Sequence, residues 1–218
     1  MPRKKTPNGI SKLPESFLLA RTPEQIAEAE AHVRGLLEFL GEDPNREGLL
    51  DTPARVVRAL GEHFSGYALD PGEYLAKTFE EVEGYDELVL VSDIEVYSHC
   101  EHHMVPFVGK AHVAYVPNGR IVGLSKLARV VDVYAKRLQV QEKLTKQIAD
   151  AIHTHLEPQG VAVIMQCQHF CMCYRGVRKP GSWTTTSKLH GLFLKDAAAR
   201  MELFTLIGLP RQIATRGS

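Results

Sequence analysis

Apolar residues near the start of the chain recur at intervals of three or four, a spacing that predicts helices. Thr22, Pro23 and Gln25 form a helix start, with a capping threonine, a proline in the first turn and a glutamine at the capping-box position. The apolar residues that follow at helical spacing are Ile26, Ala29, Val33, Leu36, Leu37 and Leu40. Gly41 can end this helix, and a second helix is predicted to open in the same manner at residues 51–55.

Further along the chain, alternating apolar and β-branched positions predict strands. Residues 88–96 and 107–116 have this pattern. Between the second run and residues 120–122 lies Pro117-Asn118-Gly119, which is typical of a hairpin turn. We therefore expect residues 120–122 to run back along the preceding strand.

Two amphipathic helices are predicted next, and Ser125 can cap the first of them. The apolar stripe of the first helix is Leu127, Val130, Val131, Tyr134 and Leu138, and that of the second is Leu144, Ile148, Ala151, Ile152 and Leu156. Residues 161–165 begin another strand, 184–186 suggest a last strand, and 196–206 a closing helix. Strands paired around two consecutive helices predict an α+β fold.

Composition excludes some classes of function. The chain has 218 residues, of which 44% are hydrophobic, enough for a sizeable core. Lys and Arg together number 26, as do Asp and Glu, so net charge gives no argument for a nucleic-acid or anionic-membrane partner. No apolar run approaches a membrane span, and no signal-peptide core follows the basic start, so we expect a cytoplasmic protein without a membrane partner.

Residues 98–107 carry the densest candidate chemistry. Cys100 and His103 form a Cys-x-x-His step, which lets one turn present sulfur and nitrogen to zinc. A third ligand must come from elsewhere, and an extended run there would place four candidates on one side: Cys167, His169, Cys171 and Cys173. Cysteines grouped in this way fit a reduced, metal-binding use. A closed structural zinc, with Cys167 or Cys173 as fourth ligand, is the alternative.

Four separated stretches resemble the GTP cyclohydrolase I family in matching order, within a region from about Thr52 to Ile207: residues 100–110, 123–129, 138–145 and 169–177. The resemblance implies a tunnelling fold, with an antiparallel four-stranded sheet packed against two helices and an N-terminal helical extension. It also implies a toroidal homodecamer with active sites between subunits. With the sequence pattern, it gives a flexible basic arm at 1–17, a helical region at 18–68 and a catalytic domain at 69–218.

The implied reaction converts GTP and water to 7,8-dihydroneopterin triphosphate and formate, the first step of pterin biosynthesis for folate or tetrahydrobiopterin. The zinc ligands implied are Cys100, His103 and Cys171. Such chemistry needs a nucleophilic water, which zinc with an open position supplies. His102 and His169 match the family's proton-carrying histidines, although His102 can also support the metal from outside its ligand shell.

The remaining expected site residues bind substrate. Glu142 resembles the carboxylate that reads guanine, although a surface pair with Lys146 is an alternative. Gln141 resembles a neighbouring base contact, and Ser125 a residue of the ribose rearrangement. The side chains that resemble triphosphate ligands are Lys126, Arg129, Arg175, Arg55 and Arg58, with Arg55 donated by a neighbouring subunit. Lys126 and Arg129 also fit a solvated helix face.

Two other functions remain open from the sequence. One is a different tunnelling-fold enzyme, such as a pterin synthase or a deazaguanine nitrile reductase. The other is a non-catalytic assembly module in which zinc only stabilises the fold.

Overall fold

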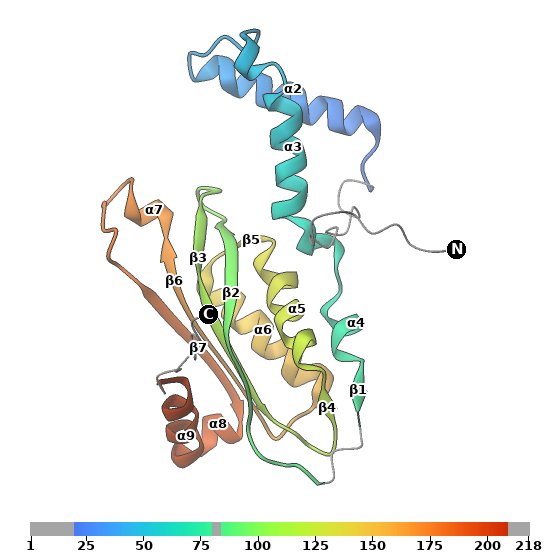
Figure 1. Ribbon diagram of the computed structural model, residues 1–218, viewed down its shortest axis with the longest axis vertical. Helices are drawn as coiled ribbons and strands as arrows, with labels where there is room; N and C mark the ends of the chain where they lie inside the picture. The colour runs from blue at the N-terminus through green and yellow to red at the C-terminus, as the bar shows by residue number, and fades with distance from the viewer. Residues whose placement is uncertain (1–19, 80–83, 209–218) are drawn as a thin grey trace, which may run out of the picture. The chain divides into compact units, whose positions relative to one another are not determined.

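The computed structural model describes residues 20–79 and 84–208 (Figure 1). The chain divides into two compact units between Ala68 and Leu69, and each is described by itself. The basic arm expected at residues 1–17 lies outside the described residues. In the described part of the chain, no helix is long and apolar enough to cross a membrane.

The N-terminal unit is helical, as predicted. It consists of α2 (Pro23–Phe39), η1 (Glu47–Leu49), α3 (Thr52–His63) and η2 (Ser65–Ala68). The capping box of α2 is present, because the Gln25 amide donates to Thr22 Oγ1 at 3.3 Å and the Thr22 amide donates to Gln25 Oε1 at 3.0 Å. Gly41 follows this helix with a φ of 87°, a left-handed conformation that favours glycine.

The second unit is organised around four long antiparallel strands, β2 (Val89–Cys100), β3 (Pro106–Val116), β6 (Gly160–His169) and β7 (Thr184–Gly191). They lie in the order β2-β3-β6-β7, so the predicted four-stranded antiparallel arrangement is confirmed. A two-residue strand, β5 (Leu138–Gln139), joins the edge by pairing in parallel with the end of β2. The sequence did not predict this fifth strand.

Two predicted details of the sheet are wrong, because each depends on which strands lie next to one another in the folded protein. The predicted hairpin partner, β4 (Ile121–Val122), pairs with β1 (Thr78–Phe79) instead of β3. Both edges of β3 are already taken by β2 and β6. The cysteine run is not one extended strand either, since β6 ends at His169 and α7 (Phe170–Cys173) follows. The pairing of β6 with β7 ends at Cys167 opposite Thr184, and its pairing with β3 ends at His169 opposite Phe107. No strand is therefore left to pair with the residues that follow His169.

Helices cover both faces of the sheet (Figure 1). On one face lie α4 (Pro71–Leu75), α5 (Leu124–Ala135) and α6 (Gln141–Leu156), and on the other α8 (Leu192–Lys195) and α9 (Ala197–Gly208). The predicted stripes supply the core, which includes Leu127, Val130, Val131, Leu144, Ile148 and Ile152. Ser125 does not cap α5, whose N-cap is Gly123, so that prediction is wrong.

Candidate active site

A tight turn after β2 positions the Cys-x-x-His step. The Cys100 amide donates to the Val105 carbonyl at 2.9 Å, and the Met104 amide donates to the Cys100 carbonyl at 2.8 Å. Met104 has a φ of 53°, which lets the chain reverse within a few residues. The turn brings Cys100 Sγ to 3.8 Å from His103 Nδ1.

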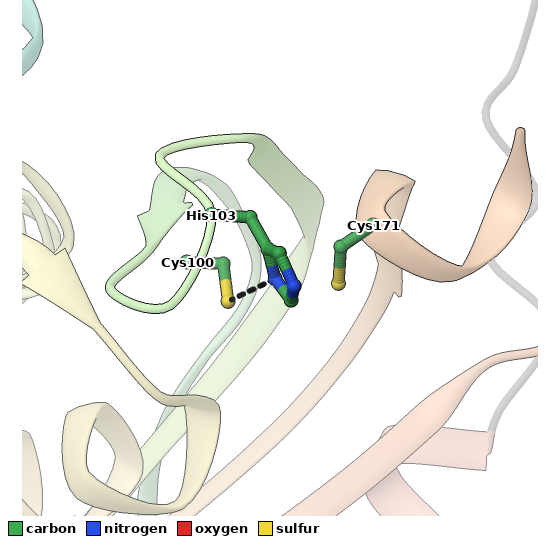
Figure 2. Close-up of side chains that lie close together, drawn as sticks. All are labelled: Cys100, His103 and Cys171. Carbon is green, nitrogen blue, oxygen red and sulfur yellow. Dashed lines mark hydrogen bonds between the residues drawn. The ribbon is translucent and has the colours of Figure 1, made fainter. Parts of the chain in front are cut away.

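Cys171 reaches the same place from α7 (Figure 2). The ligand atoms of Cys100, His103 and Cys171 all lie within 4.8 Å of one another. Cys100 is buried, Cys171 is half-buried and His103 is exposed, so the cluster lies at the protein surface with one side open. Sulfur and nitrogen atoms at this spacing suit a tetrahedral zinc ion.

The two thiols of the cluster affect one another. Burial raises the pKa of Cys171, and the neighbouring Cys100 sulfur raises it further. Two sulfurs placed together in this way disfavour a thiolate unless a cation compensates for its charge. A divalent metal ion supplies that compensation, which is how metal binding releases protons from cysteines.

The other two cysteines do not join the cluster. Among the described residues, metal-capable atoms come together only at the three positions named above. Cys167 lies in the core on β6, where burial raises its pKa to about 12. Cys173 is 9% exposed at the end of α7. Neither residue supplies the fourth ligand of a closed structural site.

Two further histidines adjoin the metal-capable cluster. His102 Nδ1 lies 3.7 Å from Cys100 Sγ, and its side chain is exposed. His169 ends β6, and its ring stacks on Phe107 with centroids 4.6 Å apart. Burial lowers the pKa of His169, and the nearby Glu142 carboxylate opposes this shift.

The start of α6 presents Glu142 to solvent. In the described part of the chain, its carboxylate takes part in no hydrogen bond or ion pair, since Lys146 pairs with Asp150 instead. The surface pair with Lys146 considered from the sequence is therefore absent. Gln141 differs, because its side chain is 1% exposed and its amide bonds within the protein. Any contact of Gln141 with a base is therefore left to its main chain.

Cations gather instead at the start of α5. Burial lowers the pKa of Lys126, and the charges of Arg129 and Lys77 lower it further, so the three cations lie close together. The β1–β4 pairing explains the place of Lys77, since Thr78 opposite Val122 brings it beside the α5 N-cap. No side chain caps this helix end, where the dipole of α5 also favours an anion.

The cation group and the metal-capable cluster lie at opposite ends of the sheet. The Val122 amide donates to the Tyr115 hydroxyl, near the end of β3 that pairs with the start of β2. Cys100, by contrast, is the last residue of β2, at the other end of that strand. The stretch of α5 from Lys126 to Ala135 spans about 14 Å along the helix axis, and this length contributes to the separation of the cation group from the metal-capable cluster.

The remaining predicted cations are divided between the two units. Arg175 follows α7 and lies near the metal-capable cluster, where its charge opposes the rise in the pKa of Cys171. Arg55 and Arg58 lie on α3 in the N-terminal unit, and Arg55 pairs with Asp51 at 2.9 Å. Ser125 is exposed in the first turn of α5.

Comparison with known proteins decides the family. The GTP cyclohydrolase I family model matches residues 29–208. The chain belongs to the GTP cyclohydrolase I family. It is 59% identical over 181 residues to GTP cyclohydrolase 1 of Brucella abortus, covering 83% of this chain and 85% of that protein. Identity to GTP cyclohydrolase 1 of Brucella canis is 58% over the same length and coverage.

Membership of the GTP cyclohydrolase I family confirms three predictions: the resemblance itself, the α+β tunnelling fold and an enzymatic role. A solved structure, archaeosine synthase QueF-Like in the apo form, also matches, with 18% identity and a TM-score of 0.41. That match covers 48% of this chain and 93% of the other.

Sequence reasoning missed two features of this GTP cyclohydrolase I family site. Lys77 belongs to no recognisable sequence motif. It lies near Lys126 only because β1 pairs with β4, which is distant in the sequence. The inward-facing amide of Gln141 was also missed, because its partners come from β6 and β7. A glutamine at the first position of a predicted helix gave no signal of burial.

Proposed function

We propose that this enzyme uses zinc to convert GTP and water to 7,8-dihydroneopterin triphosphate and formate, the first step of pterin biosynthesis. The observation that carries the proposal is the cluster of Cys100, His103 and Cys171 beside two histidines, in a chain of this family. Removing C8 of guanine as formate requires water to attack that carbon and protons to move on and off the ring.

Zinc fits the cluster because its two sulfurs and one imidazole leave one tetrahedral position open. Cys100, His103 and Cys171 would hold the ion. When bound there, zinc would make water nucleophilic near neutral pH. The exposed side of the cluster, at His103, gives substrate and water access.

His102 and His169 are the proposed proton carriers. Imidazole changes its charge near neutral pH, so it can give a proton to a ring nitrogen and later remove one. The two residues differ in surroundings, since His102 is exposed and His169 is half-buried against Phe107. This difference supports separate roles, and Ser125 is proposed for the later ribose rearrangement.

Guanine recognition is assigned to the start of α6. The N1–H and 2-amino groups of guanine are donors, and the unpaired Glu142 carboxylate can accept from both. No side chain caps α6, so its first N–H groups are available to the O6 acceptor, including that of Gln141. Adenine lacks this pattern, so the same arrangement discriminates against ATP.

The triphosphate is assigned to the cation group at the start of α5 and to three arginines. The residues proposed are Lys77, Lys126, Arg129, Arg175, Arg55 and Arg58. Because Lys126 and Cys100 lie at opposite ends of one sheet, we propose that each site combines two or more subunits. A homodecamer with sites between subunits satisfies this requirement. A cytoplasmic location belongs to the same proposal, supported by the four free cysteines.

Incubation with GTP tests the reaction. We expect release of formate in step with a product that becomes fluorescent neopterin after oxidation and dephosphorylation. Another tunnelling-fold enzyme would release no formate from GTP, and that result would overturn the proposal. Zinc removal, followed by circular dichroism, tests the assembly-module alternative: loss of activity with the fold intact supports catalysis, whereas unfolding supports a structural zinc.

A further inference from the structure

The side chain of Gln141 links α6 to the two strands that flank its start. Its amide nitrogen lies 3.1 Å from the Met165 carbonyl, 2.9 Å from the Thr184 carbonyl and 3.1 Å from Thr186 Oγ1. Its oxygen lies 2.8 Å from His169 Nε2. The residue is 1% exposed, so these protein groups replace water as its partners.

These partners fix which way the amide faces. The carbonyl oxygens of Met165 and Thr184 can only accept hydrogen bonds, so the group opposite them must be the NH2. The reversed amide would place its oxygen against two carbonyl oxygens, and no hydrogen bond can form between such acceptors. The oxygen of Gln141 therefore faces His169, and an amide oxygen can only accept.

We propose that Gln141 is a positioning residue that fixes the neutral tautomer of His169, with its hydrogen on Nε2, and holds the imidazole ring in its place against Phe107. This inference rests on the proposed function only for the catalytic use of His169. A neutral imidazole carries one hydrogen, and only Nε2–H can donate to the amide oxygen.

Neighbouring residues also hold the imidazole ring of His169 in place. Phe107 stacks on His169 with ring planes 11° from parallel, which restricts rotation of the imidazole. Thr145 Oγ1 donates to the Gln141 carbonyl at 2.8 Å, which restrains the start of α6. Because the amide contacts His169 and no exposed surface, its loss is expected to lower kcat while leaving the KM for GTP nearly unchanged.

A spectroscopic measurement tests the proposal without GTP. Solid-state 15N spectra of the zinc-loaded protein, labelled at histidine, distinguish the two tautomers, and His169→Ala assigns the signal. We expect His169 with hydrogen on Nε2 and an unprotonated Nδ1. A hydrogen on Nδ1 in the neutral ring would overturn the proposal. Failure to release formate from GTP would instead contradict the proposed function, so the two failures are distinguishable.

A pair of matched variants tests the consequence for catalysis. Gln141→Met keeps the length of the side chain but removes the acceptor, and we expect mixed tautomers and a kcat about 10²-fold lower. Gln139→Met is the control, because Gln139 is also 1% exposed and bonds to the Tyr134 carbonyl and Gln147, away from His169. Equal losses of kcat in both variants, or an unchanged tautomer in Gln141→Met, would contradict the inference. If Gln141→Met does not fold, the spectrum of the parent protein decides.

Discussion

The rings of Phe107 and His169 stack with their centroids 4.6 Å apart and their planes 11° from parallel. The two residues are also register partners of β3 and β6. A shift of one residue in this pairing would turn His169 to the other face of the sheet, because side chains alternate along a strand. The place of the proposed proton carrier therefore depends on the register of the central strands, whose ends also lead to Cys100 and Cys171.

Replacement of Cys171 tests the proposed metal ligand. Cys171→Ala removes one of two sulfurs, so we expect bound zinc to fall and GTP turnover to drop by more than the roughly 10- to 100-fold that loss of an outer partner costs. Metal analysis and formate release measure the two effects. Cys173→Ala is the matched control on the same short helix, and we expect it to keep both zinc and activity. Normal zinc content in Cys171→Ala would refute the assignment.

Local signals predicted much of this structure correctly. The capping box at Thr22 and the apolar stripe of α6 depend on residues a few positions apart, so the sequence displays them directly. The pairing of Cys100 with His103 is local in the same sense, because one turn brings their side chains together.

What the sequence did not predict depends on distant neighbours. Cys171 lies on α7 because β6 loses β7 as a partner after Cys167 and β3 after His169, and alternation within the run gives no sign of this. Residues 121–122 pair with β1 because both edges of β3 are occupied. The amide orientation of Gln141 likewise depends on carbonyls of two strands that come later in the chain.

Replacement of Glu142 tests guanine recognition. Glu142→Gln keeps the shape of the side chain but replaces a charged acceptor with an amide that offers one oxygen. Hydrogen bonds to charged groups contribute about 1.5–3 kcal/mol, so we expect kcat/KM for GTP to fall roughly 10- to 100-fold. Glu157→Gln, beyond the opposite end of α6, is the control and should behave like the parent. Unchanged GTP affinity in Glu142→Gln would show that guanine is read elsewhere.

His112 gives a prediction about stability and pH. The residue is 6% exposed, and its Nδ1 accepts from the Asp93 amide at 3.2 Å. Burial, and then the charge of Lys110, lower its pKa below the usual 6.5. The folded state therefore favours the neutral ring, so this stabilisation is full above pH 6.5 and is lost as pH falls toward the lowered pKa.

The variant His112→Asn separates this effect from the rest of the pH dependence. Asparagine keeps an acceptor for the Asp93 amide but cannot titrate. We expect the urea midpoint of the parent to decrease as the pH drops below 6.5, because its free energy of unfolding decreases by about 1.4 kcal/mol per unit of lowered pKa. The urea midpoint of the variant should decrease less. Protein concentration is held constant, since assembly shifts apparent stability. Parallel curves for the two proteins would contradict the assignment to His112.

The separation of Lys126 from Cys171 predicts complementation between inactive subunits. Cys171→Ala disables the metal-capable end of the sheet, and Lys126→Ala disables the cation group at the other end. If each site takes its metal from one subunit and its cations from another, co-assembled hybrids contain some sites with both parts intact. Two differently tagged chains, co-expressed and purified over both tags, should therefore release formate from GTP faster than either variant alone.

A second pairing controls for effects of co-assembly itself. Lys126 and Arg129 belong to the same cation group on α5, so Lys126→Ala with Arg129→Ala leaves every site with a damaged cation group. We expect no gain in activity from this pair. If the Cys171→Ala and Lys126→Ala hybrid also shows no gain, each site is built within one chain. The triphosphate would then be held by cations at the metal-capable end, where Arg175 lies near Cys171.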